Sequence, residues 1–144
     1  MYKKILVASD GSIHAKKAID TAADVARKYK AELTVITIIQ HPMDAFGIYG
    51  LEELGTEAYS LLKKKGDEIQ KEAKEQLKDL HDLNVFFILD YGNPGDTIVQ
   101  YAKKKNFDLI VMGSHGYSKT MAHILGSVSD RVNHNAHCSI LIVK

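Results

Sequence analysis

Short apolar segments alternate with longer amphipathic ones along the whole chain. The apolar segments are rich in Val, Ile and Leu and most of them are bounded by turn-forming residues, a pattern typical of strands buried on both faces of a parallel sheet. Five strands are predicted, at Lys4–Ser9, Leu33–Ile39, Val85–Leu89, Asp108–Met112 and Ser139–Val143. Their number and shortness already favour a layered α/β protein over a helical bundle.

The amphipathic segments repeat their apolar residues every three or four positions, as helices packed on a sheet do. Ser12 and Asn93 stand where side-chain N-caps are expected, and Pro94 suits the first turn of a helix. Four helices are predicted, at Ile13–Tyr29, Glu52–Leu83, Pro94–Lys105 and from about Ser127 to Ala136.

The second predicted helix is the longest. Its heptad-like spacing also suggests a coiled coil, but its position between two strands favours one crossover helix that covers the sheet. Gly66 weakens it midway by about 1 kcal/mol relative to alanine. The run Lys63-Lys64-Lys65 is interpreted as its solvated face, and segment 41–50 before it as a loop whose Phe46 and Tyr49 are candidates to fold over a site.

The resulting order, βαβαβαβαβ, predicts a single α/β domain over residues 1–144. Its five strands are expected to form a doubly wound parallel sheet with right-handed crossovers. In such sheets ligands bind beyond the carboxyl ends of the strands, at the point where the strand order reverses.

A glycine-containing loop between the fourth strand and the last helix has the pattern G-x2-G-x9-G-S, formed by Gly113, Gly116, Gly126 and Ser127. Gly113 is expected to let a ligand approach the backbone, and Gly116 to adopt a positive φ that turns N–H groups inward. Gly126 is expected to begin a helix whose free N–H groups attract an anion, with Ser127 and Ser129 adding hydroxyl donors. The loop is predicted to hold phosphate.

Lys119-Thr120 within this loop invites comparison with the P-loop of nucleotide triphosphatases. That motif requires a glycine directly before the lysine and a helix directly after it. Here Ser118 precedes the lysine, and the next helix is not expected before about Ser127. A P-loop is therefore rejected.

The four loop positions, the opening ILVASDGS and the C-terminal stretch from Gly126 to Lys144 resemble the universal stress protein family, in its ATP-binding branch. The resemblance covers essentially the whole chain. It implies a Rossmann-like fold of the adenine nucleotide alpha hydrolase type with strand order 3-2-1-4-5. The order then reverses between the strands that end at Asp10 and Gly113.

The same resemblance implies a set of nucleotide-binding residues. The adenosine would contact the first two strand ends, and the phosphates would lie between the glycine loop and the last helix. The implied residues are Ala8, Ser9, Asp10, Ile38, Met112, Gly113, His115, Gly116, Gly126, Ser127, Val128 and Ser129. Asp10 has a structural alternative, since an Asp before Gly commonly binds turn amides. No catalytic residue is assigned, because no Ser/His/Asp or Cys/His arrangement is recognisable.

Lys119 is the single cation inside the loop, so backbone dipoles alone would have to balance a triphosphate. A Mg²⁺ or Mn²⁺ ion bound through the phosphates is therefore expected, with Asp10 the nearest candidate carboxylate. The group His134, His137 and Cys138 lacks the fourth ligand and paired spacing of a zinc site and is interpreted as structural or surface-exposed.

Composition limits the partners and the cellular compartment that can be expected. Nineteen basic and eighteen acidic residues give a net charge of +1, which offers no basic footprint for nucleic acid or an acidic membrane. The single cysteine permits no internal disulfide and suits a reducing compartment, and no apolar run has the length of a membrane span. A cytoplasmic protein is expected.

The function that follows is a nucleotide-dependent regulatory or stress-response module that binds ATP. Relatives in the family imply a homodimer that pairs the apolar C-terminal strand, Ser139–Val143, with its twin. Two alternatives stay open: a slow ATP-hydrolysing enzyme, and a partner-binding domain without nucleotide. A phosphate-receiving signalling domain is disfavoured, because Asp10 stands alone where an acidic pair is needed.

Overall fold

The computed structural model describes residues 1–40, 52–116 and 125–144. Strands and helices alternate there in the predicted order, with no cis peptide bond among the described residues. The elements are β1 (Lys4–Ala8), α1 (Ile13–Tyr29), β2 (Glu32–Ile39), α3 (Glu52–Leu77), β3 (Val85–Tyr91), α4 (Pro94–Lys104), β4 (Leu109–Gly113), α5 (Ser127–Asn135) and β5 (Ser139–Val143).

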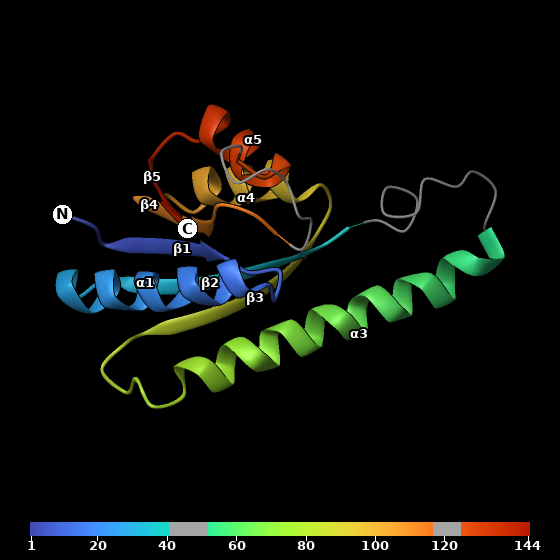
Figure 1. Ribbon diagram of the computed structural model, residues 1–144, viewed down its shortest axis with the longest axis horizontal. Coiled ribbons are helices and arrows are strands. Elements are labelled where there is room, and N and C mark those ends of the chain that lie inside the picture. Colours follow the sequence, from blue (N-terminus) through green and yellow to red (C-terminus); the bar gives the residue numbers. More distant parts are fainter. Residues whose placement is uncertain (41–51, 117–124) are drawn as a thin grey trace.

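The five strands form one parallel sheet in the order β3-β2-β1-β4-β5, which confirms the predicted topology. Helices α1 and α3 cover one face of the sheet, and α4 and α5 cover the other (Figure 1). The strand order reverses between β1 and β4, which pair in register from Ile5–Leu109 to Val7–Val111. The crevice that accompanies such a reversal therefore lies beyond Ala8 and Gly113.

Alternating side chains of the central strands supply two separate cores. Ile5 and Val7 of β1 pack toward α1 and α3, whereas Leu6 packs toward α4 and α5. All three side chains are fully buried. This explains why the strands read as continuous apolar runs instead of alternating ones, since each face of the sheet is covered by helices.

The predicted helix starts are confirmed by side-chain caps. The Ser12 hydroxyl accepts a hydrogen bond of 3.2 Å from the Ala15 N–H, and the Asn93 side chain accepts one of 3.2 Å from the Asp96 N–H. The bounds of α1 and β5 are as predicted, and most others differ by one residue. Two predicted element ends differ from the observed ends by more than one residue.

The helix predicted to reach Leu83 ends at Leu77, so that boundary was wrong. Leu80 and Leu83 continue the apolar spacing because they pack against the α1–α3 core from turns beyond the helix. The end predicted for the third strand, at Leu89, was also wrong, because β3 continues to Tyr91. The long strand β2 supplies partners there, pairing Ile38 with Asp90 and Ile39 with Tyr91.

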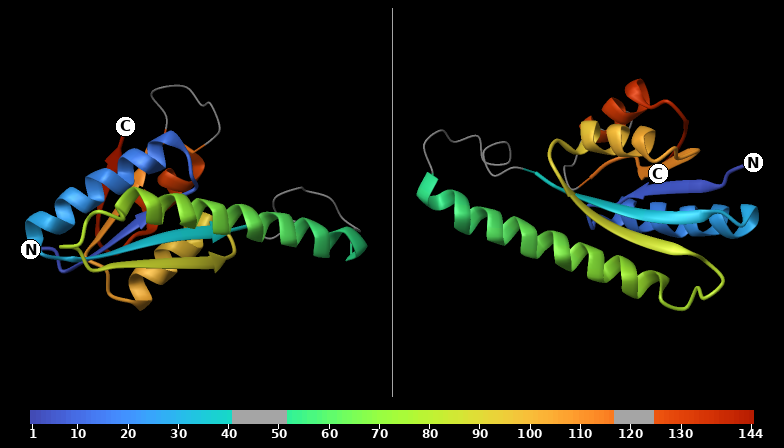
Figure 2. Two further views of the ribbon diagram at one scale, coloured as in Figure 1. Left: turned by 90° about the horizontal axis from the view of Figure 1, so that it is seen from below. Right: turned by 180° about the vertical axis from the view of Figure 1, so that it is seen from behind.

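Helix α3 lies along β2 and β3, and its N-terminal part extends past the ends of the strands (Figure 2). It is a crossover helix, as favoured over the coiled coil. Gly66 is buried at its contact with the sheet, where an added Cβ would lie 3.0 Å from side-chain atoms of both Ile39 and Leu89. The residue that weakens the helix thus permits its close approach to the strands.

The outer surface of α3 is polar, and Lys63, Lys64 and Lys65 are exposed as predicted. Lys63 forms an ion pair of 3.0 Å with Asp67 one turn away. Across the three described ranges, no helix is long and apolar enough to cross a membrane. The loop prediction for 41–50, with Phe46 and Tyr49, and the predictions for Lys119 and Thr120 concern residues outside the described ranges.

Asp108 anchors the start of β1, and its substitution by asparagine should weaken the fold at neutral pH. Its carboxylate accepts hydrogen bonds of 2.8 and 2.9 Å from the N–H groups of Lys3 and Lys4, which lower its pKa below the ordinary value of 3.8. A carboxyl group whose pKa is lower in the folded than in the unfolded chain stabilises the folded state at pH values above its unfolded pKa. This stabilisation is lost as the pH falls through the pKa of the folded state.

We expect Asp108→Asn to reduce the free energy of unfolding at pH 7 by about 1 kcal/mol and to flatten its decline below about pH 4. Urea unfolding at several pH values measures both effects. Asp79→Asn, on an exposed residue after α3, is the control and should change neither. Equal acid sensitivity of Asp108→Asn and the unmodified chain would contradict the assignment.

Candidate functional site

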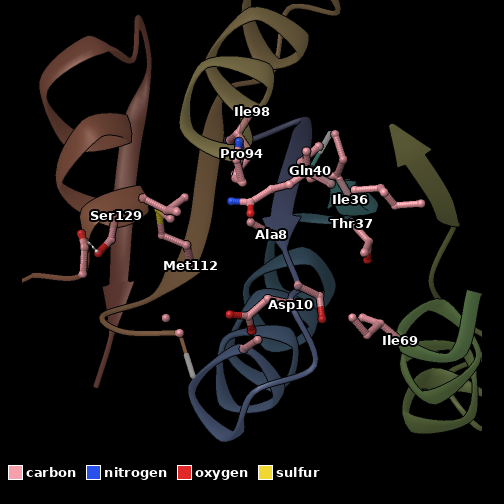
Figure 3. Close-up of a pocket in the computed structure, with 18 of the residues that line it drawn as sticks. Ala8, Asp10, Ile36, Thr37, Gln40, Ile69, Pro94, Ile98, Met112 and Ser129 are labelled. Carbon is pink, nitrogen blue, oxygen red and sulfur yellow. Dashed lines mark hydrogen bonds between the residues drawn. The ribbon is translucent and has the colours of Figure 1, made fainter. Parts of the chain in front are cut away.

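A pocket of about 520 Å³ opens at the carboxyl ends of β1, β2 and β4, where the strand order reverses (Figure 3). Its walls come from both layers of helices. Helix α5 and the start of α4 border one side, and α3 borders the other. The volume lies within the range of about 300–1,000 Å³ that is common for small-molecule sites.

The structure brings all of the sequence-predicted site residues together. Each of the twelve lines this one pocket, although they come from three strand ends, the glycine loop and α5. They are Ala8, Ser9, Asp10, Ile38, Met112, Gly113, His115, Gly116, Gly126, Ser127, Val128 and Ser129. Their contact with a nucleotide stays a prediction, whereas their convergence is a feature of the fold.

The turn after β1 holds Asp10 at the centre of the pocket. Gly11 adopts a φ of 80°, and one carboxylate oxygen of Asp10 accepts a 2.9 Å hydrogen bond from the Ser12 N–H. The structural alternative for Asp10 is therefore confirmed for one of its two oxygens. The second oxygen, Oδ2, faces the glycine loop near Gly116.

Gly113 is required by helix packing, a role that the sequence did not suggest. An added Cβ would lie 2.7 Å from the Cβ of His14 and 2.9 Å from its main-chain carbon. Alternation along β4 directs this position toward α1, while Met112 points to the opposite core. The glycine therefore lets the first turn of α1 reach the end of β4.

The positive φ predicted for Gly116 was wrong: the glycines described with positive φ are Gly11 and Gly92. An added Cβ at Gly116 would lie 2.6 Å from Asp10 Oδ2. Glycine suits this position because the loop passes directly over the carboxylate. Gly116 thus lets the loop after β4 contact the turn after β1, and these are the two strands between which the order reverses.

Gly126 is the N-cap residue of α5, as predicted, and forms no side-chain cap. Its N–H donates a 2.8 Å hydrogen bond to the Ser114 carbonyl. The first N–H groups of α5 have no partner within the helix, and Ser127, Val128 and Ser129 all line the pocket. The helix therefore presents its positive end to the pocket.

The hydroxyl of Ser129 is not the additional ligand donor that the sequence suggested. Ser129 is 2% exposed, and its Oγ lies 2.9 Å from the carbonyl oxygens of both Ser114 and Gly126. Its single proton is directed to these internal acceptors. Ser127, which is exposed, retains the predicted position at the rim.

His115 lies at the pocket wall beside a second histidine. Its Nδ1 is 2.9 Å from the Ser114 hydroxyl, and its ring is 5.7 Å from that of His14, between centroids. The Nδ1 atom of His14 is buried without a hydrogen-bond partner. His14 was not singled out in the sequence, because its position on α1 gives no indication of contact with β4.

Several lining residues were missed by sequence reasoning. Gln40 and Pro94 follow the ends of β2 and β3, so the strand-end rule was sufficient to find them. The α3 residues carry no such signal, because only tertiary packing brings this helix to the strand ends. The further lining residues are Ala15, Ile36, Thr37, Ile39, Leu62, Lys65, Gly66, Ile69 and Ile98.

Lys65 changes the electrostatic description of the site. The sequence assigned it to a solvated face and left Lys119 as the nearby cation. In the structure Lys65 is exposed and also lines the pocket from α3, on the side opposite α5. The pocket therefore has a cation at one side and a helix N-terminus at the other.

No three His, Cys, Asp or Glu residues of the described ranges lie close enough together to hold a metal ion. His134 and His137 are exposed, and the His134 ring bonds the Asp130 carbonyl at 2.9 Å. Cys138 is half-buried against the α4–α5 core, and this burial raises the pKa of its thiol. It therefore behaves as a packed, weakly reactive cysteine.

Comparisons with known proteins agree with this architecture. A family model described as the universal stress protein family matches residues 1–144. Universal stress protein MJ0531 of Methanocaldococcus jannaschii is 36% identical over 145 residues, which span all of this chain and 83% of the relative.

Solved structures are similar over nearly their whole length. Universal stress protein UspA from Lactobacillus plantarum has a TM-score of 0.87 at 24% identity, covering 99% of this chain and 98% of that one, which is a likeness of fold. A universal stress protein in complex with cAMP has a TM-score of 0.73 at 27% identity, covering 99% and 97%.

Two glycines of the loop should respond differently to alanine. Gly113→Ala places a methyl group against the α1 backbone and is expected to cost about 2 kcal/mol of folding free energy, as overpacking does. Gly116→Ala meets only a side-chain oxygen of Asp10, which can rotate, and should cost less than about 1 kcal/mol. Urea unfolding of both variants tests this; equal losses would refute the distinction.

Proposed function

The chain belongs to the universal stress protein family, and we propose that its pocket binds an adenine nucleotide, with ATP as the expected ligand. We further propose that it acts as a nucleotide-dependent regulatory module in the form of a homodimer. One observation carries the proposal: the N-terminus of α5, without a side-chain cap, opens into a pocket at the reversal of the strand order. Such helix ends are suited to phosphate groups.

The remainder of the pocket suits a nucleoside. Met112 and Ile98 provide apolar surface between α5 and α3, and Asp10 offers a carboxylate at the centre (Figure 3). Ile38 also lines the pocket. Ribose hydroxyls are donors that a carboxylate oxygen accepts. The relative solved with cAMP holds an adenine nucleotide, which supports the same ligand class for this chain.

A Mg²⁺ or Mn²⁺ ion fits this arrangement only as a partner of the phosphates. Asp10 is the one carboxylate among the described lining residues. Magnesium sites of this kind use phosphate oxygens and water with one or two carboxylates. Bound there, the ion would neutralise phosphate charge that the α5 dipole leaves unbalanced.

The homodimer is proposed to form through β5. This strand lies at the edge of the sheet, and its Val143 carbonyl accepts a 2.8 Å hydrogen bond from the Ser114 N–H. By alternation, the main-chain groups of Ile140 and Ile142 face outward. An apolar edge strand with free main-chain groups is a template for pairing with a second chain.

A negative charge at the start of α5 should prevent nucleotide binding. Ser127→Glu places a carboxylate beside the proposed phosphate position, and we expect ATP affinity to fall at least about tenfold at low salt. Isothermal titration calorimetry measures the change. Folding should not suffer, because an acidic side chain in the first turn favours the helix.

Ser127→Gln is the matched control, with nearly the same size and no charge, and should bind ATP within about threefold of the unmodified chain. If Ser127→Glu binds ATP as tightly as Ser127→Gln does, the phosphates do not lie at α5. If the unmodified chain binds no adenine nucleotide, the proposed function is wrong.

Proline at an outward-facing position of β5 should abolish the dimer. Ile140→Pro removes an N–H that no strand of the same sheet uses, a change that edge strands tolerate. We expect a monomer by light scattering at micromolar concentration. Ile140→Ala removes the same apolar contacts but keeps the N–H and should stay dimeric. A dimeric Ile140→Pro protein would exclude pairing through β5.

A further inference from the structure

A buried amide joins α3 to the wall of the pocket. The Gln70 Nε2 group donates a hydrogen bond of 2.7 Å to the Thr37 hydroxyl and one of 3.0 Å to the Ile88 carbonyl. Gln70 is 7% exposed and Thr37 is 2% exposed. The helix and two strands therefore meet at one polar contact within an otherwise apolar layer.

The direction of these bonds follows from the chemistry of the partners. A main-chain carbonyl can only accept, so the amide nitrogen of Gln70 must face Ile88. The same nitrogen then donates to Thr37, and the Thr37 oxygen acts as acceptor. The Thr37 proton is left over, and no hydrogen bond donated by it is found among the described residues. Yet Thr37 lines the pocket.

The layout of the pocket indicates which part of a bound nucleotide would face the Thr37 proton. α5 and Ser129 lie at one end, Asp10 is central, and Thr37 and Ile69 lie at the α3 end (Figure 3). A nucleotide with its phosphates at α5 and its ribose near Asp10 extends its base toward α3. There Ile39, Leu62 and Ile69 offer apolar contacts to a flat ring.

We propose that the Thr37 hydroxyl donates a hydrogen bond to a ring nitrogen of the bound purine and that Gln70 is the positioning residue that enforces this direction. The inference rests on the proposed function, since it assigns the base end of the same site. The Gln70 amide uses one lone pair of the Thr37 oxygen, and the Thr37 proton, which has no acceptor among the described residues, is available to the ligand.

The expected selectivity follows from this polarity. Adenine carries ring-nitrogen acceptors at N1, N3 and N7; guanine shares the N3 and N7 acceptors but carries a hydrogen on N1, so a hydroxyl that donates to N1 separates the two bases. The buried Thr37 hydroxyl strongly favours a base that places an acceptor opposite it. A base without that acceptor leaves the hydroxyl proton without a partner. Thr37 is thus a specificity-determining contact made by a side chain outside the glycine loop.

The test compares ATP with its 1-deaza, 3-deaza and 7-deaza analogues, each lacking one ring-nitrogen acceptor, by isothermal titration calorimetry. Thr37→Val removes the hydroxyl with little change of shape, and we expect ATP to bind about tenfold more weakly. One analogue should already bind the unmodified chain about tenfold more weakly and should lose nothing further with Thr37→Val. Thr37→Ser should retain ATP binding.

Gln70→Met, which keeps the volume but removes the amide, tests the positioning role. It should weaken ATP binding, but combined with Thr37→Val it should cost no more than Thr37→Val alone, because Gln70 acts through Thr37. Thr34→Val alters another buried threonine of β2 that does not line the pocket and should leave ATP binding unchanged. Circular dichroism verifies the fold of every variant.

Two outcomes overturn the inference while the proposed function stands. One is ATP binding by a folded Thr37→Val protein with unchanged affinity. The other is an equal loss for all three deaza analogues with Thr37→Val, which would show a general structural effect. Absence of ATP binding by the unmodified chain would instead refute the proposed function itself.

Discussion

The main chain of Ser114 is the connection on which the geometry of the pocket depends. Its N–H donates to the Val143 carbonyl at the end of β5, and its carbonyl accepts from the Gly126 N–H and the Ser129 hydroxyl. One buried residue after β4 therefore fixes the edge strand and the start of α5 together. Because buried main-chain groups must be paired, α5 has little freedom to turn its N-terminus away from the pocket.

Close approaches between elements complete the frame. Gly113 lets α1 touch the end of β4, Gly66 lets α3 lie against β2 and β3, and Gly116 lets the loop pass over Asp10. At each position an added Cβ would intrude on atoms of a neighbouring segment. The glycines thus shape the pocket through the packing of the protein itself. The proposed phosphate site at the start of α5 depends on that packing.

Much of the fold was readable from the sequence because each element carries a local signal. Branched apolar runs marked the strands, and Ser12 and Asn93 marked helix starts. The predicted element ends were wrong where tertiary contacts produce a similar residue pattern or override the local one. Leu80 and Leu83 kept a helical spacing although they pack from turns, and Asp90-Tyr91 joined β3 because β2 offered it partners.

The sequence by itself determined the alternation of elements and the glycine loop between β4 and α5, because these depend on neighbours along the chain. The strand-end residues that line the pocket were implied by the family resemblance. The strand order came from family resemblance and not from any pattern. Only the tertiary structure decided the contribution of α3, with Lys65, Ile69 and the Gln70–Thr37 contact. Periodicity specifies which face of a helix is buried, but where that helix meets the ends of distant strands depends on long-range packing.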